Sequence, residues 1–275
     1  MTSNLLGDPI DRVDGPLKVT GAAAYPSDIT YPGLVHAALA QSTIAPVTFR
    51  AMVPVWRIAN WHRAASPVTQ PITKFGGQPT WLGRPQWPLS ASRGTPMRFV
   101  CQIVLQPELF GDGPVRLAYV FVTHGEHGRD AEEFDPDVVL PDGGENAVVV
   151  QPGAFTGPTA SSTSGPTLYH EDGSPAEYTV DLVRGEDPEP MVSEAYLGLP
   201  ADERDRYFRT VDHDKIGGTA LPLDQHDLPA PGSWRLLLRL ATNWTPFHLN
   251  LGAAPVVLAF LSTDAREGRL LVEDS

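Results

Sequence analysis

The sequence predicts a β-rich α+β fold with mostly antiparallel sheets, few short helices and two related halves. Among its 275 residues are 28 prolines and 25 glycines, which predict many turns and short elements. Between the turns lie apolar runs of strand length. In addition, Lys-Phe-Gly-Gly at 74–77 returns as Lys-Ile-Gly-Gly at 215–218. Paired glycines beside a bulky apolar residue indicate backbone that needs positive φ or a very close neighbour.

Composition narrows the class of protein. A chain with 41% hydrophobic and 19% charged residues is typical of a folded protein. The formal net charge of −13 disfavours nucleic acid as a partner, because phosphate binding needs a basic face. No apolar run approaches the ~18 residues that span a bilayer, and no secretory signal is visible, so we expect a cytoplasmic protein without a membrane partner. The single cysteine, Cys101, lies in an apolar run and is interpreted as a core residue.

Residues 1–45 are expected to form an extended appendage punctuated by turns. They contain Asp-Arg-Val-Asp-Gly at 11–15, Lys-Val-Thr-Gly at 18–21, Pro-Gly-Leu at 32–34 and His-Ala-Ala-Leu at 36–39. This string resembles the start of the molybdenum-binding subunits of xanthine dehydrogenases and aldehyde oxidases, where it implies a structural entry to the hammerhead domain. The cofactor loops and the C-terminal glutamate base of that family have no counterpart here, so we interpret the segment as a transplanted leader. An accessory fragment of a molybdenum hydroxylase is the weaker alternative.

Residues 46–275 are expected to form one domain with halves at about 70–155 and 178–275. Apolar residues at mixed three- and four-residue spacings over 47–66 predict a helix covering a sheet, started or interrupted at Pro54. Strands are predicted at 98–105, 115–123 and 147–151. The first of these is apolar on both faces except at Gln102, so we expect it to be central. A loop at 156–177, rich in Ser, Thr, Gly and Pro, is expected to join the halves.

The second half is expected to repeat the first. A strand at 178–183 and a short helix at 200–208 precede the second glycine pair. The motifs lie 141 residues apart (215 − 74), and the strand at 258–261 corresponds to 117–120 at the same offset (258 − 117). A strand at 234–240 corresponds to 97–103 at an offset of 137 (234 − 97). The returning offset indicates a duplication. In this alignment Gln102 falls opposite Arg239, and the two are expected to face a shared seam.

Further short motifs surround these strands. They are Lys-Phe-Gly-Gly-Gln-Pro at 74–79, Trp-Pro at 87–88, Pro-Met-Arg-Phe at 96–99, Gly-Gly-Glu-Asn-Ala at 143–147 and Gln-Pro-Gly at 151–153. Together they resemble the YwqG-like family of bacterial proteins. The resemblance implies an α+β domain with antiparallel sheets, and it implies no activity or cofactor. The placement of some relatives near toxin loci suggests partner binding.

We therefore predict a cytoplasmic, non-catalytic binding or protein-interaction module with no cofactor and no metal, whose partner is another protein or a small ligand. The predicted binding residues belong to the two motifs, the aromatic, proline-rich loop from Trp81 to Trp87 (the aromatic loop) and the seam: Lys74, Gly76, Gly77, Trp81, Trp87, Gln102, Lys215, Gly217, Gly218 and Arg239. Each motif lysine could hold an anion beside exposed backbone amides. Equally, each could cap a strand end or pair with an acid of this acidic chain.

The alternative is a metal-dependent hydrolase that uses the acidic loop from His124 to His127. The loop and the residues after it form the densest group of possible metal ligands: His124, Glu126, His127, Asp130, Glu132 and Glu133. A His-x-x-His spacing ligates zinc where the backbone places both rings on one side, and otherwise the loop is simply solvated. The sequence also contains a candidate for acid–base catalysis, Asp-His-Asp at 212–214. The same three residues can instead form a turn with capping carboxylates.

Overall fold

The computed structural model describes residues 51–221 and 234–274, and a ten-stranded antiparallel sheet organises this part of the chain. The strand order is β12-β11-β10-β9-β1-β8-β2-β4-β5-β6, and two short strands, β3 (Trp87–Pro88) and β7 (Thr159–Ala160), form a separate pair. A strand-rich, mostly antiparallel architecture with few short helices confirms that part of the prediction. The predicted appendage at 1–45 lies outside the described residues.

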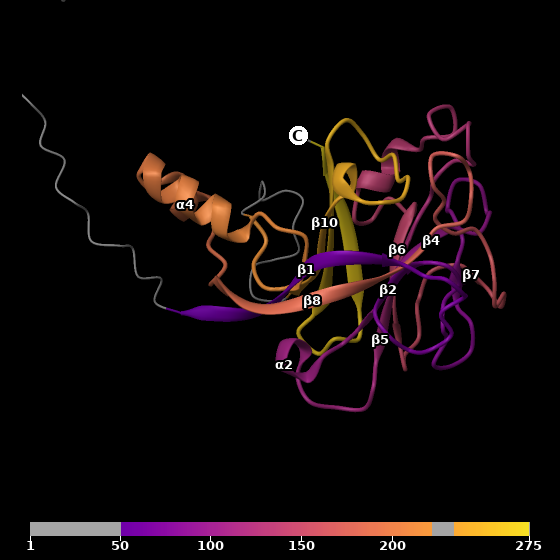
Figure 1. Ribbon diagram of the computed structural model, residues 1–275, viewed down its shortest axis with the longest axis horizontal. Coiled ribbons are helices and arrows are strands. Elements are labelled where there is room, and N and C mark those ends of the chain that lie inside the picture. The colour runs from indigo at the N-terminus through magenta and orange to yellow at the C-terminus, as the bar shows by residue number, and fades with distance from the viewer. Residues whose placement is uncertain (1–50, 222–233, 275) are drawn as a thin grey trace, which may run out of the picture. The chain divides into compact units, whose positions relative to one another are not determined.

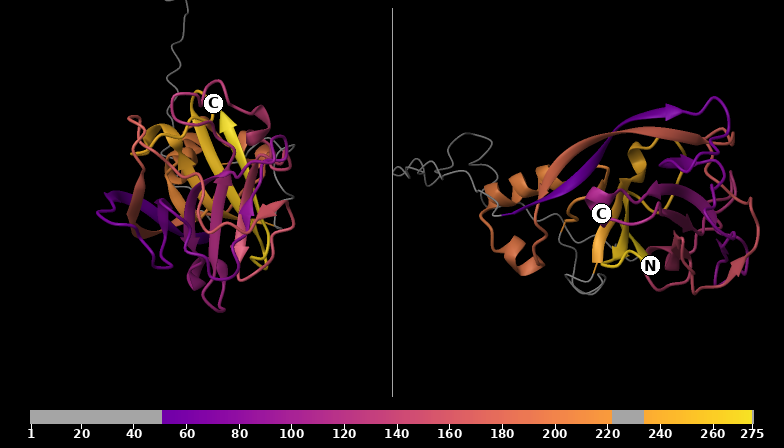
Figure 2. Two further views of the ribbon diagram at one scale, coloured as in Figure 1. Left: turned by 90° about the vertical axis from the view of Figure 1, so that its right-hand side faces the viewer. Right: turned by 90° about the horizontal axis from the view of Figure 1, so that it is seen from below.

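The strands are arranged alike on either side of the centre of the sheet: a three-residue strand comes first, and three longer strands follow it. In the middle, β1 (Met52–Arg63) and β8 (Glu177–Pro188), 12 residues each, run side by side (Figures 1 and 2). Beyond β8 follow β2 (Lys74–Gly76), β4 (Arg98–Val104), β5 (Leu117–Val122) and β6 (Asn146–Gln151). Beyond β1 follow β9 (Lys215–Gly217), β10 (Trp234–Ala241), β11 (Pro255–Ser262) and β12 (Gly268–Asp274). Thus β2 follows β1 in the chain but pairs with β8, whereas β9 follows β8 but pairs with β1.

The helices of the described part are short. They are α2 (Pro107–Phe110), α3 (Ser193–Leu197) and α4 (Ala201–Val211), with 3₁₀ turns η2 (Pro136–Val139) and η3 (Thr242–Trp244). The predicted helix at 200–208 is confirmed as α4, which begins after Pro200 with acidic residues in its first turn, where the helix dipole favours them. Figure 1 shows α4 beside one end of the β1–β8 ribbon. Within the described ranges, no helix is long and apolar enough to cross a membrane.

The helix predicted within 47–66 is wrong, because this segment contains strand β1. Trp56, Ile58 and Trp61 of β1 all pack against the main core. A strand should place such residues two apart, but the register with β8 shifts between Ile58 and Asn60. A β-bulge adds one residue at that point, which turns the spacing from Ile58 to Trp61 into three. The bulge therefore accounts for the part of the mixed spacing that follows Ile58.

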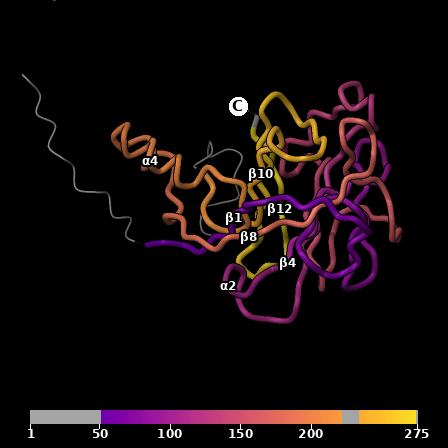
Figure 3. Tube along the Cα trace, in the orientation of Figure 1, coloured from indigo at the N-terminus to yellow at the C-terminus, as the bar shows by residue number. Residues whose placement is uncertain are grey.

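The strands predicted in both halves are confirmed, and β4 is an interior strand between β2 and β5. Both faces of β5 are buried: Ala118, Val120 and Val122 join the main core, whereas Leu117, Tyr119 and Phe121 join a second core with Trp87. The sheet curls until its edge strands, β12 and β6, lie against each other (Figure 3). Their closeness is shown by Gly268 of β12, where an added Cβ would lie 2.3 Å from Cγ1 of Val148 in β6. The curled sheet positions the loops that carry the candidate site.

Candidate functional site

The two motif lysines are buried and paired with carboxylates from the same strand, β8. The Lys74 Nζ lies 2.7 Å from Glu177 Oε1, and the Lys215 Nζ lies 2.5 Å from Asp187 Oδ2. Each ammonium group also donates to a main-chain carbonyl, that of Val68 or Val211 respectively. These contacts occupy the lysines within the fold. They match the interpretation of the lysines as partners of acids, and they leave the anion-binding interpretation without support.

The glycine pairs make room for these ion pairs. Gly76, Gly77, Gly217 and Gly218 all have positive φ, between 65° and 74°. A Cβ placed on Gly77 would lie 2.2 Å from Oε1 of Glu177, and one on Gly218 would lie 2.4 Å from Oδ2 of Asp187. The second glycine of each pair therefore leaves the space that the carboxylate fills when it approaches the lysine.

Gln102 and Arg239 occupy matching places beside the motifs, since Lys74 is paired in register with Gln102 and Lys215 with Arg239. Gln102 Nε2 donates to the Ile72 carbonyl at 2.8 Å and fixes the chain before β2. Four strands separate β4 from β10 in the sheet order, and Gln102 and Arg239 contact different partners, so these contacts give the predicted seam no support.

Arg239 instead forms ion pairs with two acidic residues, Asp212 and Asp214. Burial raises the pKa of Asp214, although Arg239 and the Ala241 amide act in the opposite direction. The guanidinium engages both carboxylates, and His213 acts on Asp214 only as a minor electrostatic influence. The acid–base interpretation of residues 212–214 therefore gains no support from the contacts, and the turn with paired carboxylates fits them.

The aromatic loop packs onto the sheet. Trp87 is fully buried, and its Nε1 donates to the Met97 carbonyl at 2.7 Å. Trp81 is half-buried, with its ring centroid 4.8 Å from that of Tyr119. Burial in this second core raises the pKa of Tyr119 to about 12. The predicted binding tryptophans thus cover the outer face of β4–β6.

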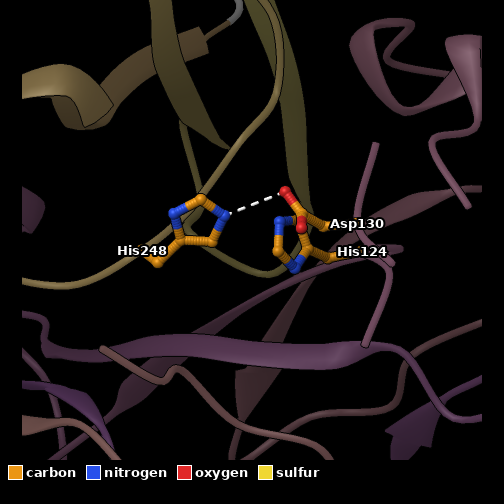
Figure 4. A group of neighbouring side chains, drawn as sticks. All are labelled: His124, Asp130 and His248. Carbon is orange, nitrogen blue, oxygen red and sulfur yellow. Dashed lines mark hydrogen bonds and ion pairs between the residues drawn. The ribbon is translucent and has the colours of Figure 1, made fainter. Parts of the chain in front are cut away.

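Ligand-type side chains converge elsewhere, where two loops meet. The loop after β5 carries His124 and Asp130, and the loop between β10 and β11 carries His248. Ligand atoms of these three residues lie within 4.8 Å of one another, and Figure 4 shows the His248 ring facing the Asp130 carboxylate, with the His124 ring next to Asp130 in this view. We call this group the histidine–aspartate cluster. All three residues are partly buried.

Hydrogen bonds hold the cluster together. Asp130 Oδ2 accepts from His248 Nε2 at 2.9 Å and from Asn250 Nδ2 at 3.3 Å. Burial acts to raise the pKa of Asp130, but these hydrogen bonds outweigh it and lower that pKa. The Asn250 amide N–H donates to His124 Nε2 at 3.2 Å, so in the neutral ring the proton is on Nδ1. Asn250 therefore links the aspartate to the second histidine.

Tyr169 packs against both histidines. Its hydroxyl oxygen lies 3.4 Å from His124 Nδ1, and its ring stacks on His248 with centroids 5.5 Å apart. The Arg98 Cζ lies 4.9 Å from the centre of the Tyr169 ring. Burial, and next the charge of Arg98, lower the pKa of His124 to about 4. The His124 imidazole is consequently neutral at pH 7 with a lone pair on Nε2.

His127 is not part of the cluster, although its ring packs edge-on against the Tyr169 ring with centroids 5.4 Å apart. His127 Nε2 lies 2.7 Å from the Glu171 carbonyl oxygen, and the His127 side chain is exposed. Its place beside His124 is taken by His248, which is 124 residues further along the chain (248 − 124). No other possible metal ligand, whether His, Cys, Asp or Glu, lies near His248 in the sequence. No local spacing could therefore have indicated it.

A scan against protein-family models gave no match for this chain, and a search of curated proteins gave none either. The resemblance to the YwqG-like family therefore stays a prediction.

Protonation of His124 should make the folded state less stable in acid. Its pKa of about 4 in the fold is below the ordinary 6.5, so the unfolded chain binds this proton first. The contribution of His124 to the free energy of unfolding is therefore constant above about pH 6.5. It falls as the pH drops from about 6.5 through about 4, by up to ~3 kcal/mol. We expect chemical denaturation at pH 7.5 and pH 4.5 to show this loss, and His124→Gln to reduce it. An unchanged pH dependence in His124→Gln would contradict the assignment.

Proposed function

We propose that this protein is a non-catalytic protein-interaction module and that its contact surface lies on the α3–α4 hairpin (residues 192–211). The observation that carries the proposal is a group of large apolar side chains left in solvent on this hairpin. Val192 is 45% exposed, Leu197 is 64% exposed and Phe208 is 43% exposed. Exposed apolar groups gathered on one element are typical of protein contact surfaces.

The packing of the hairpin supports this proposal. No residue of α3 is buried, and α4 buries only Tyr207 and Val211. The main core therefore needs few of the hairpin's apolar side chains, and Leu197 and Phe208 contribute little to the fold from their exposed positions. A partner that covered them would gain the free energy of burying them, about 1.5–3 kcal/mol for each fully buried side chain.

Negative charge introduced on this apolar surface should weaken partner binding. We expect Leu197→Glu combined with Phe208→Glu to lower recovery of the natural partner at least about tenfold, since large buried side chains dominate contact energies. The measurement is site-specific photo-crosslinking from position 197 in the native cell, followed by quantitative co-purification with the double variant.

Val115→Glu provides the matched control, because Val115 is also 64% exposed but lies in the loop before β5. A crosslinker at position 115 should not capture the same protein, and Val115→Glu should retain it. Partner recovery that survives the double variant, or that falls equally with Val115→Glu, would contradict the proposed surface. Thermal melting of each variant checks that the fold is intact.

We also infer that the domain is a duplication of the YwqG-like type, with the α+β organisation that this resemblance implies. The mirrored strand order, the two 12-residue central strands and the two three-residue motif strands support this inference. A cytoplasmic location stays a prediction. The metal-dependent hydrolase formulated on His124 and His127 has less support, because His127 contacts Glu171 instead.

The relation of residues 1–45 to molybdenum hydroxylases stays a prediction that a pull-down can test. Association with small iron–sulfur and flavin subunits would support the accessory-fragment hypothesis. If deletion of residues 1–45 changes neither the melting temperature nor the crosslinked partner, the segment is a passenger.

A further inference from the structure

We propose that His124, Asp130 and His248 form a binding site for a divalent transition metal, Zn²⁺ first among them. This inference is independent of the partner-binding surface, which lies on a different element. It also replaces the ligand set that the sequence suggested, because His248 takes the role expected of His127. Two imidazoles and one carboxylate are a donor set typical of zinc and related ions, and they leave a coordination position open.

The spacing of the donor atoms suits a small ion. Zinc lies about 2.0–2.2 Å from nitrogen and oxygen ligands, which places ligand atoms of a tetrahedral site roughly 3.3 Å apart. His248 Nε2 and Asp130 Oδ2 are already 2.9 Å apart, and all three donor atoms fall within 4.8 Å. A modest closing movement of the two loops would therefore complete the three-ligand set.

The donor atoms are positioned by contacts outside the cluster. His124 Nε2 carries the lone pair of the ring and accepts a 3.2 Å hydrogen bond from the Asn250 amide, which a bound ion would replace. Its other ring nitrogen faces the Tyr169 hydroxyl, and Asn250 Nδ2 contacts Asp130. Metal-binding histidines commonly donate their second ring N–H to such an outer partner, which fixes the ring orientation. The same tyrosine stacks on His248, so it orients both imidazoles.

Charge near the cluster permits a cation despite the buried Arg98. Its guanidinium donates to the carbonyls of Thr167 and Gly125, which hold it in place within the fold, although its positive charge still acts on His124. Carboxylates surround the same region, since Glu126, Asp130 and Glu133 all act electrostatically on Arg98. The negative charges of these acids thus offset the positive charge of Arg98. Asp130 is 17% exposed and His248 is 30% exposed, so an ion can enter from solvent.

The test is zinc titration of the full, untagged chain by calorimetry, with cobalt absorption spectra as a second readout of nitrogen and oxygen ligation. We expect one zinc ion per chain. His124→Ala or His248→Ala should weaken binding at least about 100-fold, because loss of an outer-shell partner alone typically costs about 10–100-fold. Tyr169→Phe, which retains the stack but loses the hydroxyl, should weaken binding about tenfold.

His127→Ala tests the other histidine of the loop, whose ring packs on Tyr169 with centroids 5.4 Å apart, and His62→Ala is the control variant. His127 belongs to the same loop as His124, and His62 forms an exposed pair with Asp181 at 2.8 Å. Both variants should bind zinc within about threefold of the wild-type affinity, less than 1 kcal/mol. Absence of stoichiometric zinc in the wild type, or equal losses in His127→Ala and His248→Ala, would overturn the proposal. Asp130→Asn preserves the shape of the side chain, so its weaker binding with an unchanged melting temperature would exclude misfolding as the cause.

Discussion

Replacement of Lys215 by methionine is expected to destabilise the fold by about 3 kcal/mol. Lys215 and Asp187 are both fully buried, and their charged atoms lie 2.5 Å apart. Removal of one partner of a buried pair leaves the other charge uncompensated, at a cost of about 3–5 kcal/mol. We expect the low end of this range, because Asp187 retains Arg57 at 3.2 Å and the Thr219 amide. Urea denaturation at pH 7 measures the change in the free energy of unfolding.

Lys74→Met is the matched comparison within the same chain. Lys74 pairs with Glu177, whose side chain is 15% exposed and can turn towards water once the ammonium is removed. The expected loss is therefore smaller, about 1–2 kcal/mol. Equal losses at the two positions would show that burial of the carboxylate does not control the cost. A loss below 1 kcal/mol for Lys215→Met would contradict the structural role assigned to the motif.

The repeated motif shows what the sequence could predict. Lys74 and Lys215 stand before glycine pairs, and this local pattern correctly indicated backbone with positive φ at both places. The strands followed from apolar runs, because burial on both faces leaves a continuous run in the sequence. The segment 47–66 was misread because a bulge changes the side-chain period, and only the pairing with β8 reveals the bulge.

The histidine–aspartate cluster shows where prediction from sequence stopped. His124 and Asp130 lie in one loop and were among the candidate ligands, whereas His248 reaches them through the tertiary fold. The same limit applies to the aromatic loop. Trp81 and Trp87 were predicted as binding residues of this loop, yet they pack over Tyr119 and Phe121 on the outer face of β5. Which face of a sheet is covered depends on packing between distant segments, so a local pattern cannot decide it.

Gly76→Ala is expected to be the most disruptive small substitution, with a loss of about 3–4 kcal/mol. Gly76 has a φ of 69°, a conformation that costs an L-residue about 1–2 kcal/mol. In addition, its new Cβ would lie 2.0 Å from the Ala176 carbonyl oxygen. That oxygen belongs to the main chain and accepts from the Gly77 amide at 3.0 Å, so it cannot move without disturbing the junction of β2 with β8. Overpacking of this kind adds about 1–3 kcal/mol.

Gly94→Ala separates the two contributions. Gly94 has nearly the same φ, 65°, but a Cβ there would meet nothing within 4 Å. Its expected loss is therefore the conformational cost alone, about 1–2 kcal/mol. The difference between the two variants in urea denaturation measures how tightly β2 is held against the segment before β8. If Gly76→Ala loses no more than Gly94→Ala, the motif glycine is needed only for its φ angle, and the close approach of Ala176 is not a constraint on the fold.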